Sequence, residues 1–413
     1  MDTASQHVAI LGAGPTGLDA ALACVDTGRS FTIYEAAPQV AGGVRAWGHV
    51  RLFTPWDMNV SPRMASHLGA VGVEVPAGDA YPTGDELVDR LLEPVAALPE
   101  LAPHIRLGAK VDQVGRQGLL KHEEIATPER GGRPFRLLVL TDDGEEVANA
   151  DVVLDCTGTY GNANTLGDGG IPAPGERSLA DDIRRTIPDF DAEAAEWAGR
   201  TTLLVGAGAS AQTAATSLAR LAQEAPGTEV VWAVRSDAPT WGAVPTDPLP
   251  ERASLVAEAE RLAEGGQPGV AVRTGVVVEG LARSDGRVKV TLGNGAGPEE
   301  LVVDRVLALT GYVGDNRLYR QLQVHECYAT AAPIELSAAL LGAAAGDCLD
   351  QVSHGPDALR NPEPNFFILG MKSYGRVNQF LLRIGWDQVS DVFGILDQAA
   401  SASGQGDAEP ATA

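Results

Sequence analysis

The sequence has few lysines, no long apolar run and a marked shortage of positive charge. Its 413 residues carry 31 Lys and Arg against 55 Asp and Glu, a formal net charge of −24. A nucleic-acid-binding surface needs clustered basic residues, and an anionic membrane surface repels a chain of this charge. No stretch of about 18 apolar residues is present, so no membrane-spanning helix is expected. We therefore expect neither a nucleic-acid partner nor a membrane partner.

Cysteine is also scarce, and its spacing argues against two kinds of site. The four cysteines are Cys24, Cys156, Cys327 and Cys348. None forms a Cys-x-x-Cys pair, which argues against a redox-active vicinal disulfide and against a zinc knuckle. We interpret them as small buried residues in a reducing compartment and expect no bound metal. The short polar leader does not resemble a signal peptide, so the sequence predicts a soluble cytoplasmic protein.

Glycine is abundant, and its first cluster defines a recognisable unit. Residues 8–21 read VAILGAGPTGLDAA, which predicts a buried strand, a glycine turn and the start of a helix. Gly12 permits the tight turn, Gly14 lets a pyrophosphate approach the backbone, and Gly17 lets the helix pack close to the strand. A second predicted strand ends in Glu35, where a ribose hydroxyl needs an acceptor. The alternative is a glycine-rich turn in an ordinary α/β unit.

The same unit occurs a second time. Residues 201–215 read TTLLVGAGASAQTAA, with Gly206 and Gly208 in the positions of the first two glycines. The strand that follows ends in Arg235 rather than in an acid. This favours a 2′-phosphate, and hence NADPH over NADH, although a solvated surface arginine is the alternative. A repeated strand-turn-helix unit is far more specific than either motif alone.

A further pair of segments repeats in step with the glycine turns. Residues 151–158 read DVVLDCTG, and residues 304–311 read DRVLALTG. Each predicts a buried strand that ends in Thr-Gly beside a nucleotide site. A chain of this length is expected to form at least two domains.

On these residues the sequence resembles flavoproteins with two dinucleotide-binding domains, such as flavin-containing and N-hydroxylating monooxygenases and thioredoxin-reductase-like enzymes. The resemblance implies an α/β fold of two Rossmann-like, three-layer ββα domains, with the NAD(P)H domain inserted into a split FAD domain. FAD and NADPH are the implied cofactors. The implied boundaries are 1–165 and 303–399 for the FAD-binding domain, 166–302 for the NAD(P)H-binding domain and 400–413 for a disordered tail.

The resemblance also implies which residues contact the cofactors. Many relatives place Gly-Asp after the closing strand, whereas this chain has Met371 and Lys372 after Gly370. The next helix is expected to direct its N-terminus, near Asn378, at the flavin. The complete predicted cofactor-binding set is Gly12, Gly14, Pro15, Thr16, Gly17, Glu35, Ala36, Gly42, Gly43, Val44, Trp47, Arg51, Thr54, Val111, Thr157, Gly158, Gly206, Gly208, Ala209, Ser210, Arg235, Thr310, Gly311, Gly370 and Asn378.

The aromatic segment 47–62 follows Gly43 where similar enzymes line the flavin face. In the similar monooxygenases an Asn or Thr from this region contacts the flavin adduct, which makes Thr54 and Asn59 candidates. His49, Arg51 and Lys372 are candidate polar groups for the substrate or NADPH. The predicted catalytic set is Asn59, His49 and Lys372. For each of them a purely structural role is the alternative.

We expect an NADPH-using flavin monooxygenase that oxygenates a small molecule through a peroxyflavin, because the missing Cys-x-x-Cys argues against thioredoxin-reductase chemistry. The expected partners are a small-molecule substrate and molecular oxygen, with a homodimer as one mode of assembly. The pattern F-x-G-x-x-x-H of many flavin-containing and Baeyer–Villiger monooxygenases is absent, so neither subclass is favoured. A flavin-dependent reductase or dehydrogenase without oxygen insertion and a non-enzymatic nucleotide sensor remain the alternatives.

Overall fold

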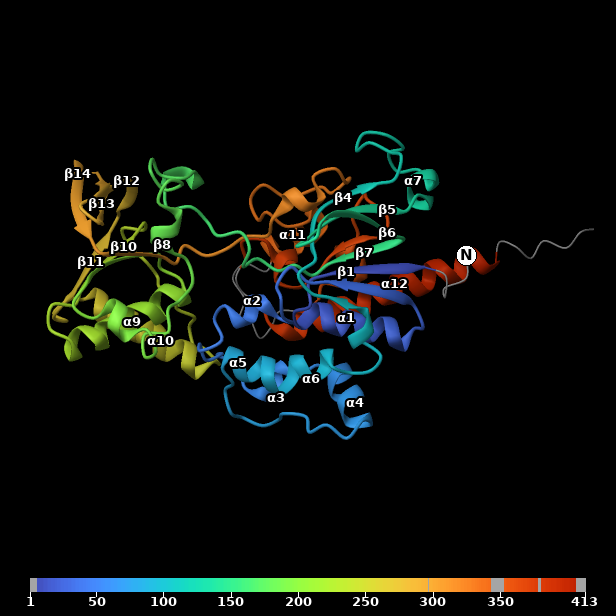
Figure 1. Ribbon diagram of the computed structural model, residues 1–413, viewed down its shortest axis with the longest axis horizontal. Coiled ribbons are helices and arrows are strands. Elements are labelled where there is room, and N and C mark those ends of the chain that lie inside the picture. The colour runs from blue at the N-terminus through green and yellow to red at the C-terminus, as the bar shows by residue number, and fades with distance from the viewer. Residues whose placement is uncertain (1–5, 296, 343–352, 378–379, 406–413) are drawn as a thin grey trace, which may run out of the picture. The chain divides into compact units, whose positions relative to one another are not determined.

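The chain folds into two compact units in a computed structural model that describes residues 6–295, 297–342, 353–377 and 380–405 (Figure 1). Unit 1 comprises Met1–Asn162 and Val313–Ala413, and unit 2 comprises Ala163–Tyr312. The second unit is therefore inserted into the first. Over the described ranges, no helix combines the length and the apolar character that crossing a membrane requires.

A five-stranded parallel sheet forms the centre of unit 1. The strand order is β16-β7-β1-β2-β3, and each neighbouring pair is parallel. Most residues of its central strands are apolar and buried, as expected for a sheet that is covered on both faces. The strands are β1 (His7–Leu11), β2 (Ser30–Tyr34), β3 (Ile105–Arg106), β7 (Val152–Asp155) and β16 (Phe366–Ile368).

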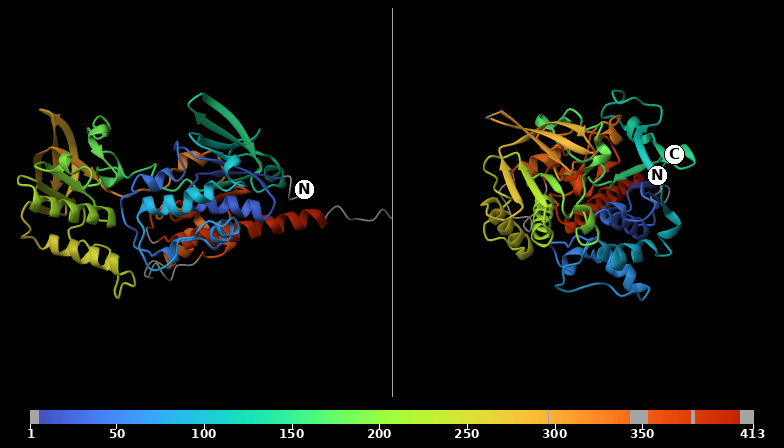
Figure 2. Two further views of the ribbon diagram at one scale, coloured as in Figure 1. Left: turned by 60° about the horizontal axis from the view of Figure 1, so that its bottom comes forward. Right: turned by 60° about the vertical axis from the view of Figure 1, so that its left-hand side comes forward.

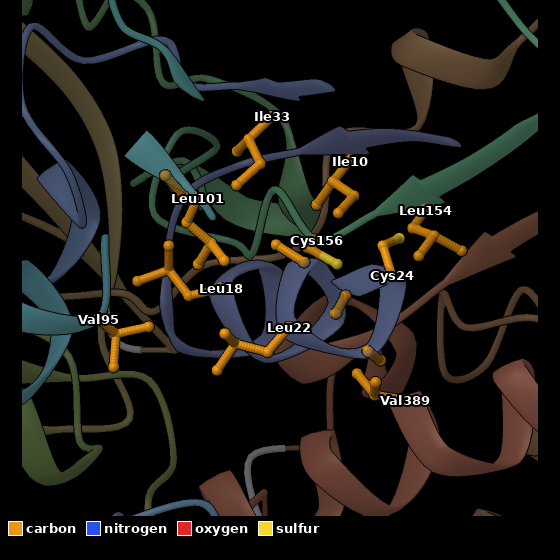
Figure 3. Close-up of a cluster of buried hydrophobic side chains, with 14 of the residues drawn as sticks. Ile10, Leu18, Leu22, Cys24, Ile33, Val95, Leu101, Leu154, Cys156 and Val389 are labelled. Carbon is orange, nitrogen blue, oxygen red and sulfur yellow. The ribbon is translucent and has the colours of Figure 1, made fainter. Parts of the chain in front are cut away.

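Helices cover one face of this sheet. The first helix, α1 (Pro15–Asp26), packs along the long C-terminal helix α12 (Leu382–Gln405) (Figures 1 and 2). Figure 3 shows Leu18 and Leu22 of α1 beside Ile10 of β1 in this core. The remaining helices of the unit are α2 (Gly42–Arg45), α3 (Trp56–Asn59), α4 (Pro62–Ala70), α5 (Gly84–Leu87), α6 (Glu93–Ala96), α7 (Pro128–Gly132) and α11 (Ile334–Gly342).

An antiparallel three-stranded sheet covers the opposite face. Along β1, Val8 and Ile10 join the helical core, whereas Ala9 and Leu11 join a second core with the antiparallel strands. This alternation follows from the two-residue period of a strand. The three strands are β4 (Lys110–Arg116), β5 (Phe135–Thr141) and β6 (Gly144–Ala150).

Unit 2 repeats this architecture strand for strand. Its parallel sheet has the order β8-β15-β9-β10-β11, and an antiparallel sheet of β12-β13-β14 packs against one face. The parallel strands are β8 (Ile183–Arg184), β9 (Thr201–Val205), β10 (Glu229–Val234), β11 (Val270–Thr274) and β15 (Arg305–Ala308). The other elements are α8 (Ala194–Trp197), α9 (Ala209–Glu224), α10 (Pro250–Ala263), β12 (Val277–Ser284), β13 (Arg287–Asn294) and β14 (Gly297–Val303).

Two predicted boundaries differ from the structure. The return to the first domain was expected at residue 303, but β15 pairs with β9 and unit 2 extends to Tyr312. The reason is that each Thr-Gly strand belongs to the sheet of its own glycine turn. The tail was expected to be disordered from residue 400, but α12 continues to Gln405. Residues 406–413 lie outside the described part of the chain.

Candidate functional site

The first glycine turn lies between β1 and α1, and its three glycines meet three different demands. Gly12 has φ +99°, and a Cβ there would lie 2.7 Å from the carbonyl oxygen of Cys156, which directly follows β7. A Cβ on Gly17 would lie 2.0 Å from the carbonyl oxygen of Gly12. At Gly14, by contrast, a Cβ would meet nothing within 4 Å. Packing therefore requires the outer two glycines, whereas the middle one borders open space, which is the arrangement that admits a pyrophosphate.

The N-terminus of α1 faces the same space. Gly14 is its N-cap with no side-chain hydrogen bond, and Pro15 occupies the first turn. The free N–H groups and the helix dipole of this 12-residue helix favour an anion. Thr16 lies under the turn, because Cβ atoms on Gly370 and Gly385 would lie 2.9 and 2.7 Å from its Oγ1 atom.

Glu35 follows β2 and is only 9% exposed. Its Oε2 atom accepts a hydrogen bond from the N–H of Ala13 at 2.7 Å, and its Oε1 atom accepts one from the N–H of Ala37 at 2.9 Å. A carboxylate has about four acceptor positions, so both oxygens can accept further donors. Glu35 is thus held by backbone N–H groups of the glycine turn and of the segment after β2, and its contact with a ribose diol stays a prediction.

Lys372 lies at the carboxyl edge of the sheet, between β7 and β16. Its Nζ atom lies 2.6 Å from Asp155 Oδ2 and donates to Thr157 Oγ1 at 3.1 Å, and both charged side chains are almost wholly buried. Thr157 also donates to Asp155 Oδ1 at 2.7 Å. Gly314 packs against this lysine and has no room for a side chain, because a Cβ there would lie 2.5 Å from the Lys372 Cγ atom.

This ion pair changes how Lys372 should be interpreted. A buried charge without a partner is very costly, so Asp155 and Lys372 depend on each other. The pair leaves no net charge at the place where many similar enzymes have a carboxylate. Lys372 was predicted as a catalytic residue, and the structure gives it a fixed partner at the floor of the first nucleotide site.

Aromatic side chains lie next to Gly43. The rings of Trp47 and Tyr160 stack with centroids 6.1 Å apart, and a Cβ on Gly43 would lie 3.9 Å from Tyr160. The indole Nε1 atom of Trp47 is buried and has no hydrogen-bond partner among the described residues. A buried donor without a partner is unfavourable, so this atom is a candidate for contact with a bound cofactor. The neighbouring Val44 is buried.

The predicted polar residues of the 47–62 segment do not converge on one point. Asn59 donates both amide hydrogens to its own loop, to the carbonyl oxygens of Thr54 and Pro55 at 2.8 Å, while its Oδ1 atom accepts from Thr54 Oγ1 at 2.8 Å. Arg51 is exposed and donates to the carbonyl oxygen of Tyr81. His49 is exposed. Asn59 and Thr54 thus brace a loop, and a catalytic role for Asn59 stays a prediction.

Other predicted residues of unit 1 are scattered around this edge. Ala36 is exposed beside Glu35, and Val111 is buried in β4 opposite Val139. Gly158 follows Thr157 with φ +66°. Gly42 has no room for a side chain, because its Cβ would lie 2.3 Å from Ala37. Asn378 lies outside the described residues.

The second glycine turn lies between β9 and α9. Gly206 has φ +131°, and its Cβ would lie 2.2 Å from the carbonyl oxygen of Leu309 in the segment after β15. Gly208 is the N-cap of the 16-residue helix α9, and a Cβ there would meet nothing within 4 Å. Ala209 and Ser210 are exposed in the first helical turn. The same two demands as in unit 1, one for close packing and one for open space, are met again.

The edge of the second sheet differs in its chemistry. Arg235 follows β10 and is exposed. Thr310 donates to the carbonyl oxygen of Asn164 at 2.7 Å, and the Asn164 amide donates to the carbonyl oxygen of Thr310 at 3.1 Å. Gly311 has φ +81°. These bonds fix the Thr-Gly turn, and contact between Arg235 and a ribose 2′-phosphate stays a prediction.

Comparison with known protein families decides the identity of the fold. The sequence pattern of the family described as pyridine nucleotide-disulphide oxidoreductase matches residues 73–330. The chain belongs to this family. It is therefore an oxidoreductase of the class that uses FAD and NAD(P)H, and the predicted fold of two Rossmann-like domains is confirmed.

Solved structures with this fold span the whole chain at low sequence identity. A bacillithiol disulfide reductase from Bacillus cereus matches with a TM-score of 0.68, 17% identity and coverage of 96% of this chain and 99% of its own. An ornithine N-hydroxylase from Kutzneria sp. 744 matches with 0.61, 15%, 95% and 99%, and a thioredoxin reductase from T. acidophilum with 0.57, 14%, 95% and 99%. No curated protein sequence matches the chain. The predicted resemblance and the prediction of FAD and NADPH are confirmed at the level of this family.

Sequence reasoning missed four residues that the geometry brings to the two turns. Asp155 pairs with Lys372, and Gln212, Trp232 and Trp241 surround the second turn. Two of them carry a signal that alignment of the repeats shows. In the alignment of the two repeats, Asp155 corresponds to Ala308, and Gln212 corresponds to Leu18. A polar side chain at a position that is apolar in the companion repeat indicates a specific local partner.

Proposed function

We propose that the protein is an NADPH-dependent flavin monooxygenase that oxygenates a small molecule. The observation that carries the proposal is the lack of a Cys-x-x-Cys pair in a sequence with two glycine turns of the dinucleotide-binding type. Burial raises the pKa of the Cys24 thiol to about 12 and that of Cys156 well above its usual range. Neither of these two thiols supplies a thiolate near neutral pH, so together they do not form a dithiol relay from the flavin to a disulfide. Cys348 lies outside the described residues.

The two turns supply separate places for the two cofactors. Unit 1 would hold FAD, with the diphosphate at Gly14, the adenosine ribose at Glu35 and the flavin end bordered by Trp47. Unit 2 would hold NADPH, with the diphosphate at Gly208 and the 2′-phosphate at Arg235. Bound FAD supplies the two-electron chemistry that passes reducing equivalents from NADPH to oxygen. The chain's own contribution is to orient the cofactors and, through the stacked rings of Trp47 and Tyr160, to shield the flavin edge from water.

A reductase without oxygen insertion is the second candidate, and Cys327 is the observation that favours it. Hydrogen bonds from the backbone N–H groups of Thr330 and Ala329 lower the pKa of the Cys327 thiol. A stabilised thiolate is a better nucleophile toward a disulfide at neutral pH. Cys327 itself is buried, but the residue next to it, Tyr328, is 99% exposed, so this loop reaches the surface.

The experiment that tests the proposal measures where the electrons of NADPH go. The FAD-loaded protein is supplied with NADPH under 18O2 and a panel of small amines and thioethers, and products are analysed by mass spectrometry. A substrate-stimulated oxidation of NADPH with one 18O atom in the product is expected. Rapid anaerobic turnover with a disulfide or an artificial acceptor, with no labelled product for any substrate, would replace the proposal with the reductase.

The variant Cys327→Ser separates the two candidates within one protein. A monooxygenase keeps its oxygenation rate in this variant, because no thiol takes part. A disulfide reductase that uses Cys327 loses turnover with disulfides and keeps its flavin reduction by NADPH.

A further inference from the structure

The carbonyl groups of the two glycine turns have different partners, and in unit 2 side chains donate hydrogen bonds to them. The indole Nε1 atom of Trp232 donates to the carbonyl oxygen of Gly206 at 2.8 Å. The Nε2 atom of Gln212 donates to the carbonyl oxygen of Ala207 at 2.9 Å and to that of Trp241 at 2.8 Å. These three hydrogen bonds join the turn, its helix α9, the strand β10 and the segment that follows β10.

Among the described residues of unit 1, the matching carbonyls meet backbone atoms rather than side-chain donors. The carbonyl oxygen of Gly12 lies against Gly17, and that of Ala13 accepts from the N–H of Ala41 at 3.1 Å. Ala41 has φ +55° in the segment after the second strand. Trp241, in the corresponding segment of unit 2, has φ +53°, and its carbonyl oxygen is linked to the turn through Gln212.

The orientation of these carbonyls matters because an anion binds on the N–H side of the turn. A carbonyl dipole that rotates toward the diphosphate repels it, whereas a carbonyl bonded on the far side leaves the N–H groups facing the ligand. Gln212 and Trp232 are 2% and 0% exposed, so both donor side chains are shielded from water. Because both acceptors of Gln212 are carbonyl oxygens, the chemistry itself assigns its amide nitrogen to them.

We infer that Gln212 and Trp232 are positioning residues for the pyridine-nucleotide site, and that they fix the second glycine turn in its anion-binding form. Trp241 joins them: its ring lies 4.8 Å from that of Trp232, and its carbonyl is held by Gln212. The segment that follows β10 is thereby linked to the turn. The inference rests on the proposal that unit 2 binds NADPH.

The test measures the dissociation constants of NADP+ and NAD+ with the FAD-loaded protein by calorimetry. The variant Gln212→Leu introduces the residue that unit 1 has at this position, and Trp232→Phe removes only the indole N–H. Each variant removes hydrogen bonding to a carbonyl of the turn. Each is expected to weaken the binding of both nucleotides by a similar factor, about five- to tenfold. The FAD content, read from flavin absorbance, is expected to stay at the wild-type level. Gln223→Leu, on the exposed last turn of α9, is the matched control and is expected to leave all constants unchanged.

The control readouts separate this role from a general structural one. A loss of packing alone lowers the melting temperature without changing the dissociation constants well below it. Constants within twofold of wild type in both variants would overturn the inference, even if unit 2 binds NADP+. Wild-type protein that binds no NADP+ would overturn the inference together with the assignment of unit 2. An effect that is confined to NADP+ and spares NAD+ would also overturn it, because the diphosphate is common to both.

Discussion

The two nucleotide units share one backbone plan and differ in the side chains that surround it. In each, the first glycine packs against the carbonyl that follows a buried strand, Cys156 in one and Leu309 in the other, and the middle glycine borders open space. Even the strand entry repeats, because Asp151 bonds to the N–H of His7 and Asp304 to that of Thr201. The comparison shows that the repeat preserves what an anion-binding backbone needs and varies what selects and holds each ligand.

The strongest test of this comparison introduces a side chain at the middle glycine of each turn, one variant at a time. Gly14→Val and Gly208→Val place a side chain where the structure shows no atom within 4 Å, at backbone angles that valine adopts without strain. Gly14→Val is expected to abolish FAD retention and Gly208→Val to abolish NADP+ binding. Flavin absorbance and calorimetry give the two readouts.

Each variant is the control for the other, since both are expected to fold. Yellow Gly14→Val protein, or loss of flavin in Gly208→Val instead, would show that the two cofactors are not assigned to these turns as proposed.

The buried ion pair is present in one unit only, and its removal is the next largest effect. Lys372→Met leaves Asp155 buried without its partner, and the expected loss in the free energy of unfolding is about 3–5 kcal/mol. The double variant Lys372→Met/Asp155→Leu is expected to recover most of it, since unit 2 has an apolar Ala308 at the place of Asp155. Urea denaturation of the three proteins measures this. A single variant as stable as wild type would contradict the account of the pair.

A buried carboxyl on the first helix also has no counterpart in the second, where the matching position is Thr213. Burial outweighs the contacts of Asp19 with Arg63 and Ser61 and raises the pKa of Asp19 to about 6. The folded state therefore holds this proton more tightly than the unfolded state does. Its contribution to stability is fully present below about pH 4 and is lost as pH rises to about 6, a change of up to about 3 kcal/mol.

The measurement compares the free energy of unfolding between pH 4 and 7 for wild type and Asp19→Asn. The variant is expected to lack this part of the pH dependence. Identical pH profiles would mean that the Asp19 carboxyl titrates in the folded state as it does in the unfolded chain.

The smallest of these effects is expected from a substitution at the end of the second strand of a unit. Glu35 is buried and bonded by backbone N–H groups, whereas Arg235 is exposed. Arg235→Ala is expected to raise KM for NADPH about tenfold, the loss of one exposed charge-assisted contact, and to leave KM for NADH nearly unchanged. Equal changes for the two nucleotides would place the recognition of the 2′-phosphate elsewhere.

Much of the fold was predictable because it repeats. The glycine spacing and the two Thr-Gly strands predicted two Rossmann-like units, and the structure confirms them. The motif is readable in the sequence because close packing at Gly12, Gly17 and Gly206 leaves no room for a side chain. The roles of the polar residues in the aromatic segment 47–62 were less predictable. Asn59 and Thr54 bond to each other and to their own loop, and no pattern in the letters distinguishes such a pair from one aimed at a ligand.

The amino-acid sequence by itself determined the two glycine turns, the acid and the arginine after the second strands, and the membership of a flavin-dependent oxidoreductase fold. These features depend on residues a few positions apart, whose local backbone demands can be read in order. Only the tertiary structure decided that Lys372 pairs with Asp155, 2.6 Å apart across the sheet edge, and that Gln212 joins the second turn to Trp241. Such partners are far apart along the chain, and only folding brings their charges and hydrogen-bonding groups within reach of each other.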